Sequence, residues 1–273
     1  MSIDLSKVEA DIVHRFVMSV TIPILHELGD AAALLATGTL FKIAGRSFII
    51  TARHVFDEVS DLTLLAYPEN PLKGSLHTFG DMAIYKPKEE HIDVAVIELL
   101  DPETLRRLHA GWQFLELKNV GIPSKNLDDG SVFVGGYPQS LTDLQDGWTT
   151  GAFLTAYTQR IPDTPSGALE PVCEDLDMFF DYGHLAHTLT GEPITTPVLK
   201  GVSGGSIWEM VEPTSTVWSP DQNVRVIGVQ SSFRHSDFIR AKNWWAVAAV
   251  LEEVDEGLAA EVHAKLNQRD RVF

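Results

Sequence analysis

The chain has 273 residues, of which 44% are hydrophobic, so it can bury a sizeable core in one large domain or two small ones. Lys and Arg number 21 against 38 Asp and Glu, which gives a formal net charge of −17 at pH 7. A negative net charge argues against a phosphate-binding surface unless basic residues cluster, and the only basic doublet is Arg106-Arg107. We therefore expect no nucleic-acid partner.

A single cysteine, Cys173, excludes an intramolecular disulfide. Residues 1–12 lack the basic segment followed by an apolar segment that marks a signal peptide. The sequence also contains no run of about 18 apolar residues, the length that a membrane-spanning helix requires. We therefore expect a cytoplasmic protein without a membrane partner. We also expect no cofactor.

The amino-terminal segment carries apolar residues at helical spacing, namely Val8, Ile12, Phe16 and Val17. This spacing predicts a helix that leads into the body of the protein and packs on it. Two apolar, β-favouring stretches follow at residues 38–43 and 47–52, on either side of the turn Ala44-Gly45-Arg46. They predict a β-hairpin.

Further short strands, separated by Gly, Pro, Asn and Asp, are expected at residues 62–67, 80–85, 94–99, 131–135, 149–158, 197–200, 206–210 and 224–230. Many short strands with few helices indicate a closed or sandwich β architecture. Residues 101–110 are predicted to form a helix, because Asp101 can cap it and Pro102 is favoured in its first turn. Residues 159–196 are expected to form a long, partly irregular excursion, and residues 241–266 a closing helix.

A run of small residues, Gly201–Ser206, places Ser203 between glycines. Glycines let a substrate carbonyl approach a serine hydroxyl closely and let backbone N–H groups point at a developing oxyanion. Taken alone, such a run is more often a loop or a flexible turn. Its significance therefore depends on residues elsewhere in the chain.

Two such residues lie upstream. His54 follows the apolar stretch 48–50, and Asp93 opens the apolar run 94–97. A histidine can take the proton of a serine and return it to a leaving amine, while an aspartate behind the ring fixes the tautomer and stabilises the imidazolium. The chain order His, Asp, Ser is the order found on paired β-barrels.

These motifs resemble those of the trypsin-like serine peptidases of the chymotrypsin clan. Residues 51–55 resemble the Thr-Ala-x-His motif, residues 92–99 the Asp-hydrophobic-Ala-hydrophobic strand, and Gly201–Ser206 the motif Gly-x-Ser-Gly-Gly. Residues 135–138 are similar to a Gly-Tyr-Pro turn that is frequent in the bacterial, disulfide-free branch. The similarity covers roughly residues 35–240.

The resemblance implies Ser203 as the nucleophile, His54 as general base and then acid, and Asp93 as the residue that orients the histidine. The backbone N–H groups of Gly201 and Ser203 would form the oxyanion hole. The implied fold is all-β dominated, with two antiparallel six-stranded β-barrels, flanked here by an amino-terminal and a carboxy-terminal helix. The expected domains are a helical extension at residues 1–30, a first barrel at residues 31–118, a linker at residues 119–127, a second barrel at residues 128–240 and a carboxy-terminal helix at residues 241–273.

Two residues depart from the family pattern. Val202 stands where many animal members have an aspartate that pairs with a freshly cleaved amino terminus. Activation by cleavage is therefore not supported, and we expect the oxyanion loop to be ordered by other means, such as a regulatory protein partner. Arg53 stands where a small residue is usual, and a cation pointing at His54 would disfavour the imidazolium.

The resemblance also implies where the specificity pocket lies. Its walls would come from two segments that include Thr196, Pro197, Lys200, Gln230, Ser231 and Ser232. No acidic residue lies between residues 195 and 200, so a preference for Arg or Lys is not supported. Lys200 leaves two alternatives open, a preference for acidic or polar side chains and a merely solvated lysine.

The sequence predicts a serine endopeptidase that acts on a protein or peptide substrate. The main alternative is a catalytically silent peptidase fold that binds a protein or peptide, and an esterase that uses the same residues is a further one. His184 and His187 have the spacing of metal ligands on a helix, with surface histidines as the simpler interpretation, and we expect no metal.

Overall fold

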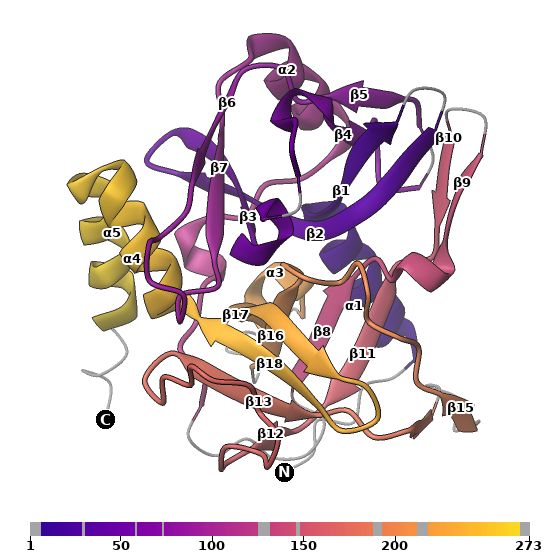
Figure 1. The fold of residues 1–273 in the computed structure, drawn as a ribbon, viewed down its shortest axis with the longest axis vertical. Helices are drawn as coiled ribbons and strands as arrows, with labels where there is room; N and C mark the ends of the chain where they lie inside the picture. The colour runs from indigo at the N-terminus through magenta and orange to yellow at the C-terminus, as the bar shows by residue number, and fades with distance from the viewer. Residues whose placement is uncertain are drawn as a thin grey trace.

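The computed structural model describes residues 7–28, 31–57, 59–72, 74–124, 132–145, 148–187, 193–211 and 218–267, and all structural statements below concern these residues. Two antiparallel seven-stranded sheets, one from each half of the chain, curl into half-barrels (Figure 1). The fold class expected from the sequence, an all-β-dominated chymotrypsin-like double barrel, is confirmed. Each sheet has seven described strands where six were expected.

The first sheet contains, in spatial order, β5 (Leu76–Thr78), β4 (Leu65–Pro68), β1 (Thr21–Leu28), β2 (Ala31–Ile43), β3 (Arg46–Thr51), β7 (Ala95–Leu99) and β6 (Met82–Tyr85). The second contains β11 (Leu154–Thr158), β8 (Val132–Gly136), β16 (Ser206–Met210), β17 (Val224–Arg234), β18 (Phe238–Asn243), β13 (Asp177–Asp181) and β12 (Arg160–Ile161). Two hairpins pair β9 (Thr142–Gln145) with β10 (Trp148–Gly151) and β14 (Leu185–His187) with β15 (Pro193–Thr195).

The described helices are α1 (Lys7–Val20), α2 (Pro102–Gly111), α3 (Pro220–Asn223), α4 (Trp244–Val254) and α5 (Glu256–Asn267). Short 3-10 turns are η1 (Arg53–Phe56), η2 (Leu62–Leu64), η3 (Leu117–Asn119) and η4 (Gln139–Leu141). No helix in the described ranges is long and apolar enough to cross a membrane.

Local sequence signals explain two elements that the sequence predicts. The turn between β2 and β3 has positive φ at both central residues, Ala44 (49°) and Gly45 (78°), which matches the twist of a two-residue hairpin. Helix α2 begins where the Asp101 carboxylate accepts a hydrogen bond from the Thr104 N–H at 2.6 Å. Both the hairpin and this helix are confirmed.

The excursion expected at residues 159–196 is partly irregular and contains β13, which pairs along its whole length with β18. Two expectations about local structure are wrong. Residues 197–200 form no strand. The expected closing helix instead begins as strand, because pairing of β18 with β17 and β13 continues to Asn243. Two helices follow, separated at Asp255, whose carboxylate accepts from the Gly257 N–H at 2.8 Å. Strand pairing outweighs the helical propensity of the Ala-rich segment.

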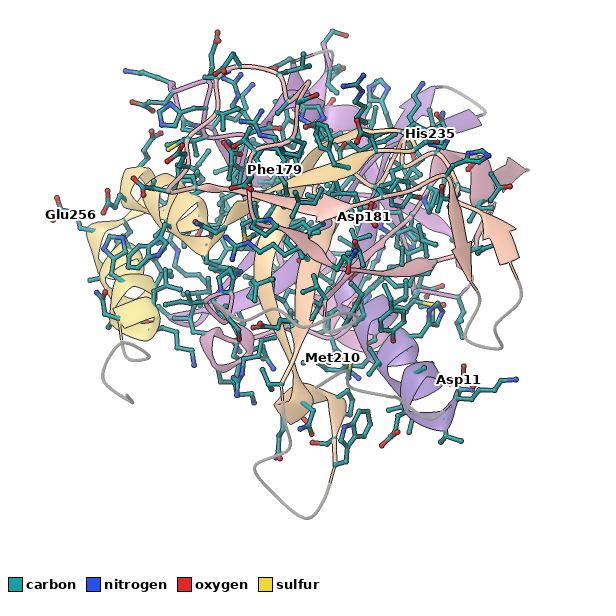
Figure 2. All side chains as sticks on the ribbon, turned by 90° about the horizontal axis from the view of Figure 1, so that it is seen from below. Asp11, Phe179, Asp181, Met210, His235 and Glu256 are labelled. Carbon is teal, nitrogen blue, oxygen red and sulfur yellow. The ribbon has the colours of Figure 1, made fainter. Side chains whose placement is uncertain are left out.

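Helices α1 and α4 each contact both halves of the chain. Helix α1 precedes β1 of the first sheet but contacts the second, where His14 Nδ1 lies 2.9 Å from Thr155 Oγ1. Helix α4 follows β18 of the second sheet but contacts the first, where Trp244 packs edge-on against Phe41 at 4.9 Å between ring centroids. In Figure 2, Asp11 on α1 and Glu256 on α5 lie on opposite sides of the molecule. The two halves are therefore joined on both flanks.

Each curled sheet encloses its own apolar cluster. The first includes Ile22, Leu40 and Ile97, and the second includes Val134, Ile207 and Ile239. The domain boundaries expected from the sequence stay a prediction, and residues 125–127 of the expected linker lie outside the described residues.

A buried ionic cluster lies against the second sheet. The carboxylate of Asp177 on β13 is fully buried and contacts Arg240 Nη2 at 2.7 Å and Lys242 Nζ at 2.5 Å, both on β18. Burial raises the pKa of Asp177, but the hydrogen bonds to Arg240 and Lys242 lower it more, so the pKa lies below its ordinary value. One carboxylate thus compensates two buried cations.

We predict that Asp177→Ala lowers the free energy of unfolding by about 3–5 kcal/mol, because it leaves both cations buried without their counter-ion. Urea unfolding would measure the loss. The matched control is Asp181→Ala on the same strand, where the side chain is exposed and the expected change is within about 0.5 kcal/mol. Equal losses for the two variants would contradict the prediction.

Candidate active site

His54 and Asp93 meet because the strands that precede and follow them are neighbours. His54 lies in η1, just after β3, and Asp93 lies just before β7. Strand β3 pairs with β7 so that Thr51 is opposite Ala95. The Asp93 carboxylate contacts His54 twice, with Oδ2 at 2.8 Å from the ring Nδ1 and Oδ1 at 3.0 Å from the backbone N–H. With the proton on Nδ1, the Nε2 lone pair faces away from Asp93.

Burial of the imidazole lowers the pKa of His54, but the hydrogen bond to Asp93 and the charges of Asp93 and Asp57 raise it more. The pKa of His54 therefore lies above its ordinary value of 6.5. Arg53 opposes this rise, but its contribution is outweighed. Its guanidinium lies 3.9 Å from the Asp57 carboxylate, one helical turn away along the chain.

The loop that carries Ser203 packs directly against the strand end that carries His54. A Cβ at Gly204, which has φ of 86°, would lie 2.1 Å from Thr51 Oγ1 and 2.2 Å from the Thr37 carbonyl oxygen. Only glycine fits so close to both groups. This contact brings Ser203 beside the segment that leads into His54.

Ser203 is half-buried. Within the described part of the chain its hydroxyl makes no hydrogen bond, so no such bond joins it to His54 in this structure. The structure thus brings His54 and Asp93 into direct contact and places the serine loop against Thr51, at the end of the strand that precedes His54.

The two N–H groups expected in the oxyanion hole have defined directions. In a trans peptide the N–H points opposite to the preceding carbonyl. The Lys200 carbonyl, which precedes Gly201, accepts from the Gln139 N–H at 2.7 Å, and the Val202 carbonyl, which precedes Ser203, accepts from a backbone N–H at 2.7 Å. The N–H groups of Gly201 and Ser203 therefore point away from these contacts, and no described residue accepts a hydrogen bond from them.

Val202 faces the interior of the second half-barrel. Its side chain is fully buried in the apolar cluster that includes Leu199 and Ile207. Its Cγ1 lies only 2.7 Å from the position of a Cβ at Gly136, so the surroundings are tightly packed. A carboxylate at this position would be surrounded by apolar side chains.

Residues of the first expected pocket segment make hydrogen bonds within the protein. Thr196 is buried, and its hydroxyl donates to the Gly183 carbonyl at 2.8 Å. The Pro197 carbonyl accepts from the Tyr182 hydroxyl at 2.6 Å. Lys200 is exposed. Of these three candidates, the lysine side chain is the one open to solvent.

The second segment holds the serine loop through its backbone. The Gln230 carbonyl accepts from the Gly204 N–H at 2.8 Å, and its side-chain amide is fully buried without a partner in the described chain. Ser231 is buried with its hydroxyl 3.3 Å from the Arg240 carbonyl, and Ser232 is exposed. Of the six candidates, Lys200 and Ser232 are the exposed ones, and the role of all six in substrate binding stays a prediction.

The sequence did not predict the contacts of two buried threonines with the second half of the chain. Thr37 and Thr39 alternate with apolar residues along buried β2, and both contact the second half of the chain. Two polar residues two positions apart in an otherwise apolar strand could have indicated these contacts. The strand predicted from the sequence, however, begins only at Gly38. His184 and His187 do not lie on a helix, because β14 begins directly after His184, and the described residues contain no group of three metal-ligating side chains.

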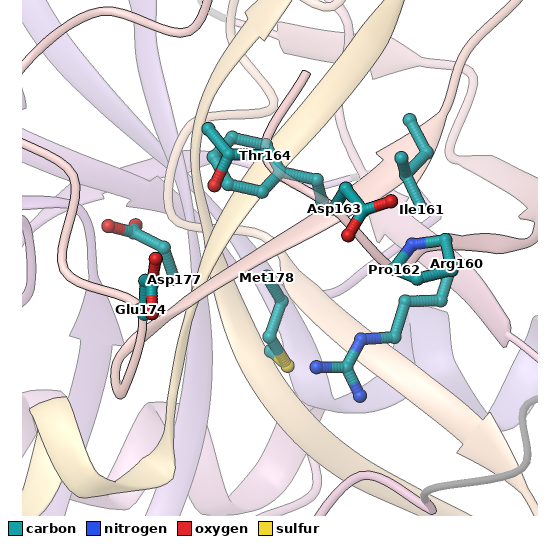
Figure 3. A pocket seen from close by; sticks show the side chains of 9 residues that line it. Arg160, Ile161, Pro162, Asp163, Thr164, Glu174, Asp177 and Met178 are labelled. Atoms are coloured by element: carbon teal, nitrogen blue, oxygen red, sulfur yellow. The ribbon is translucent and has the colours of Figure 1, made fainter.

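A cavity of about 240 Å³ lies elsewhere, beside β12 and β13 (Figure 3). Its lining is mainly polar and includes Arg160, Asp163 and Glu174. His54, Asp93 and Ser203 do not line it. The cavity is therefore separate from the candidate active site.

No protein-family model and no curated protein matches this chain. Among solved structures, the serine protease domain of the Sesbania mosaic virus polyprotein is similar, with 16% identity and a TM-score of 0.47 over 85% of this chain and 92% of that chain. A structure from work on coupled folding and binding of the intrinsically disordered Sesbania mosaic virus VPg protein is also similar, with 16% identity, a TM-score of 0.48, and coverage of 85% and 90%. At these values neither likeness bears on what this chain does.

We predict that Asp93→Asn lowers the pKa of His54, because the substitution removes the negative charge that raises it. An NMR titration of the His54 ring would measure the shift. Asp57→Asn is the control and should lower the pKa less, since Asp57 makes no hydrogen bond to the ring. An unchanged His54 pKa in Asp93→Asn would mean that the pair does not persist in solution.

We predict that Val202→Asp destabilises the protein by about 3 kcal/mol or more, because it places a carboxyl group in an apolar cluster. The pKa of the introduced carboxyl should be raised in the folded state, so the stability of this variant should fall as the pH rises above about 4. Thermal unfolding at several pH values, with Val202→Ala as the control, would test this. A variant as stable as Val202→Ala at neutral pH would contradict the inward placement of residue 202.

Proposed function

We propose that the chain is a serine endopeptidase that hydrolyses peptide bonds of a protein substrate through an acyl-enzyme. The observation that carries the proposal is the doubly hydrogen-bonded pair of His54 and Asp93, with the Ser203 loop packed on the same strand end. A histidine held in this way by a carboxylate, next to a serine between glycines, is the arrangement that acyl transfer requires.

In the proposed reaction, Ser203 Oγ attacks the substrate carbonyl carbon while His54 Nε2 takes the hydroxyl proton. Asp93 stabilises the imidazolium, and the N–H groups of Gly201 and Ser203 donate to the oxyanion. His54 then gives its proton to the amine as the C–N bond breaks. A water molecule attacks the resulting ester with His54 again as base, which releases the acid and restores Ser203.

The raised pKa of His54 sets a lower pH limit for this reaction. Because only the neutral imidazole can take the serine proton, activity should rise as the pH increases through the pKa of His54, which lies above 6.5. The proposal extends to the bacterial, disulfide-free, cytoplasmic type, supported by the single cysteine and the turn at residues 135–138.

A second candidate is a catalytically silent peptidase fold that binds a protein or peptide. The observation that favours it is the hydroxyl of Ser203, which makes no hydrogen bond to His54. In this case the residues around Ser203 would bind a protein or peptide without hydrolysing it. The two candidates differ in the reactivity of Ser203.

We predict that a fluorophosphonate probe labels the purified protein at Ser203, because an activated serine attacks the phosphorus as it would a carbonyl. Ser203→Ala should abolish the labelling, and His54→Ala should slow it about 10⁴-fold or more. Mass spectrometry of the modified peptide would identify the site.

The matched control is Ser206→Ala. Ser206 lies in the same run of small residues but is buried, with its hydroxyl 2.6 Å from Thr39 Oγ1, so this variant should still label. A wild-type protein that never labels would refute the peptidase and favour the binding module. Full labelling of His54→Ala would remove His54 from the role of base.

A further inference from the structure

Thr37 connects the first sheet to the loop around Ser203. It lies on β2 and is fully buried. Its backbone N–H donates to the Ser203 carbonyl at 2.9 Å, and its hydroxyl donates to the Gly201 carbonyl at 2.8 Å. The same hydroxyl accepts from the Tyr137 N–H at 3.0 Å. Thr37 thus bonds the loop on both sides of residue 202.

The contact with Gly201 matters because this residue is the pivot of the oxyanion loop. Gly201 has φ of 94°, a conformation that glycine enters and leaves easily. The peptide before it is held by the Gln139 N–H on the Lys200 carbonyl, and the peptide after it is held by the Thr37 hydroxyl. With both peptides held, the Gly201 N–H keeps one direction.

Within the described chain, nothing else holds the Gly201 carbonyl, and the apolar, buried side chain of Val202 has no donor to offer it. We propose that the Thr37 hydroxyl is a positioning group that keeps the oxyanion loop in its donating orientation without cleavage of the chain or a bound partner. This inference rests on the proposed peptidase function, because it concerns the same site. It assigns to a side chain of the first half the ordering that Val202 cannot supply.

The test compares Thr37→Val with Thr37→Ser. Valine keeps the shape but removes both hydrogen bonds of the hydroxyl, while serine keeps them. We expect Thr37→Val to label with a fluorophosphonate about 10²-fold more slowly than the wild type, because small displacements of catalytic donors have effects of this size. Thr37→Ser should recover most of the loss.

The matched control is Thr39→Val, two residues along the same strand. It removes a buried hydrogen bond between the two halves, from Thr39 to Ser206, without touching Gly201. Thr37→Val and Thr39→Val should lower the melting temperature similarly, and only the first should slow labelling strongly. The pKa of His54, followed by NMR, should stay unchanged in both, since neither residue contacts Asp93.

The outcomes separate the two proposals. A wild type that labels, together with equal labelling rates of Thr37→Val and Thr39→Val, would overturn the role of Thr37 and leave the peptidase intact. A wild type that never labels would overturn both. If Thr37→Val does not fold, Thr37→Cys replaces it, because a thiol is a weak donor and should give an intermediate loss.

Discussion

The arrangement of the candidate site depends on the hydrogen bonds between strand β2 and the loop around Ser203. Thr37 bonds this loop through its backbone and its side chain, and Thr39 bonds Ser206 where the loop becomes β16. Because His54 and Asp93 belong to the first half and Ser203 to the second, a site of this kind exists only while the halves keep one relative position. Buried hydrogen bonds are well suited to this, since each broken one leaves a desolvated polar group.

Two glycines set how closely the serine loop packs against β2 and against its own sheet. Gly204 lies against the Thr37 carbonyl and Thr51 Oγ1, and Gly136 lies against Val202. Side chains at either position would push the serine loop away from β2 or from its own sheet. Helices α1 and α4 support the same packing from outside, because each contacts strands of both halves. Thus the helix packing and the contacts at the site both hold the two halves in one relative position.

Charge is distributed differently at the two ionic sites. Around His54, a partly exposed carboxylate raises the pKa of the imidazole, so its protonation state responds to pH near neutrality. At Asp177, one buried carboxylate compensates two cations and its pKa is lowered, so its charge persists over the same range. The first arrangement is compatible with proton transfer, and the second compensates the charges buried between the neighbouring strands β13 and β18.

The sequence by itself determined a chain of many short strands, the β2–β3 hairpin and helix α2, because strand propensity and capping are local properties. The resemblance of its motifs to those of trypsin-like peptidases implied the double-barrel fold class and the candidates His54, Asp93 and Ser203. Only the tertiary structure decided the part played by Thr37, whose partner Gly201 is 164 positions away. It also decided that residues 177–181 and 238–243 are strands, because their pairing with each other outweighs their composition. A local sequence pattern cannot predict contacts between residues so far apart in the chain. The contact between Thr37 and Gly201 holds the loop on which the proposed chemistry depends.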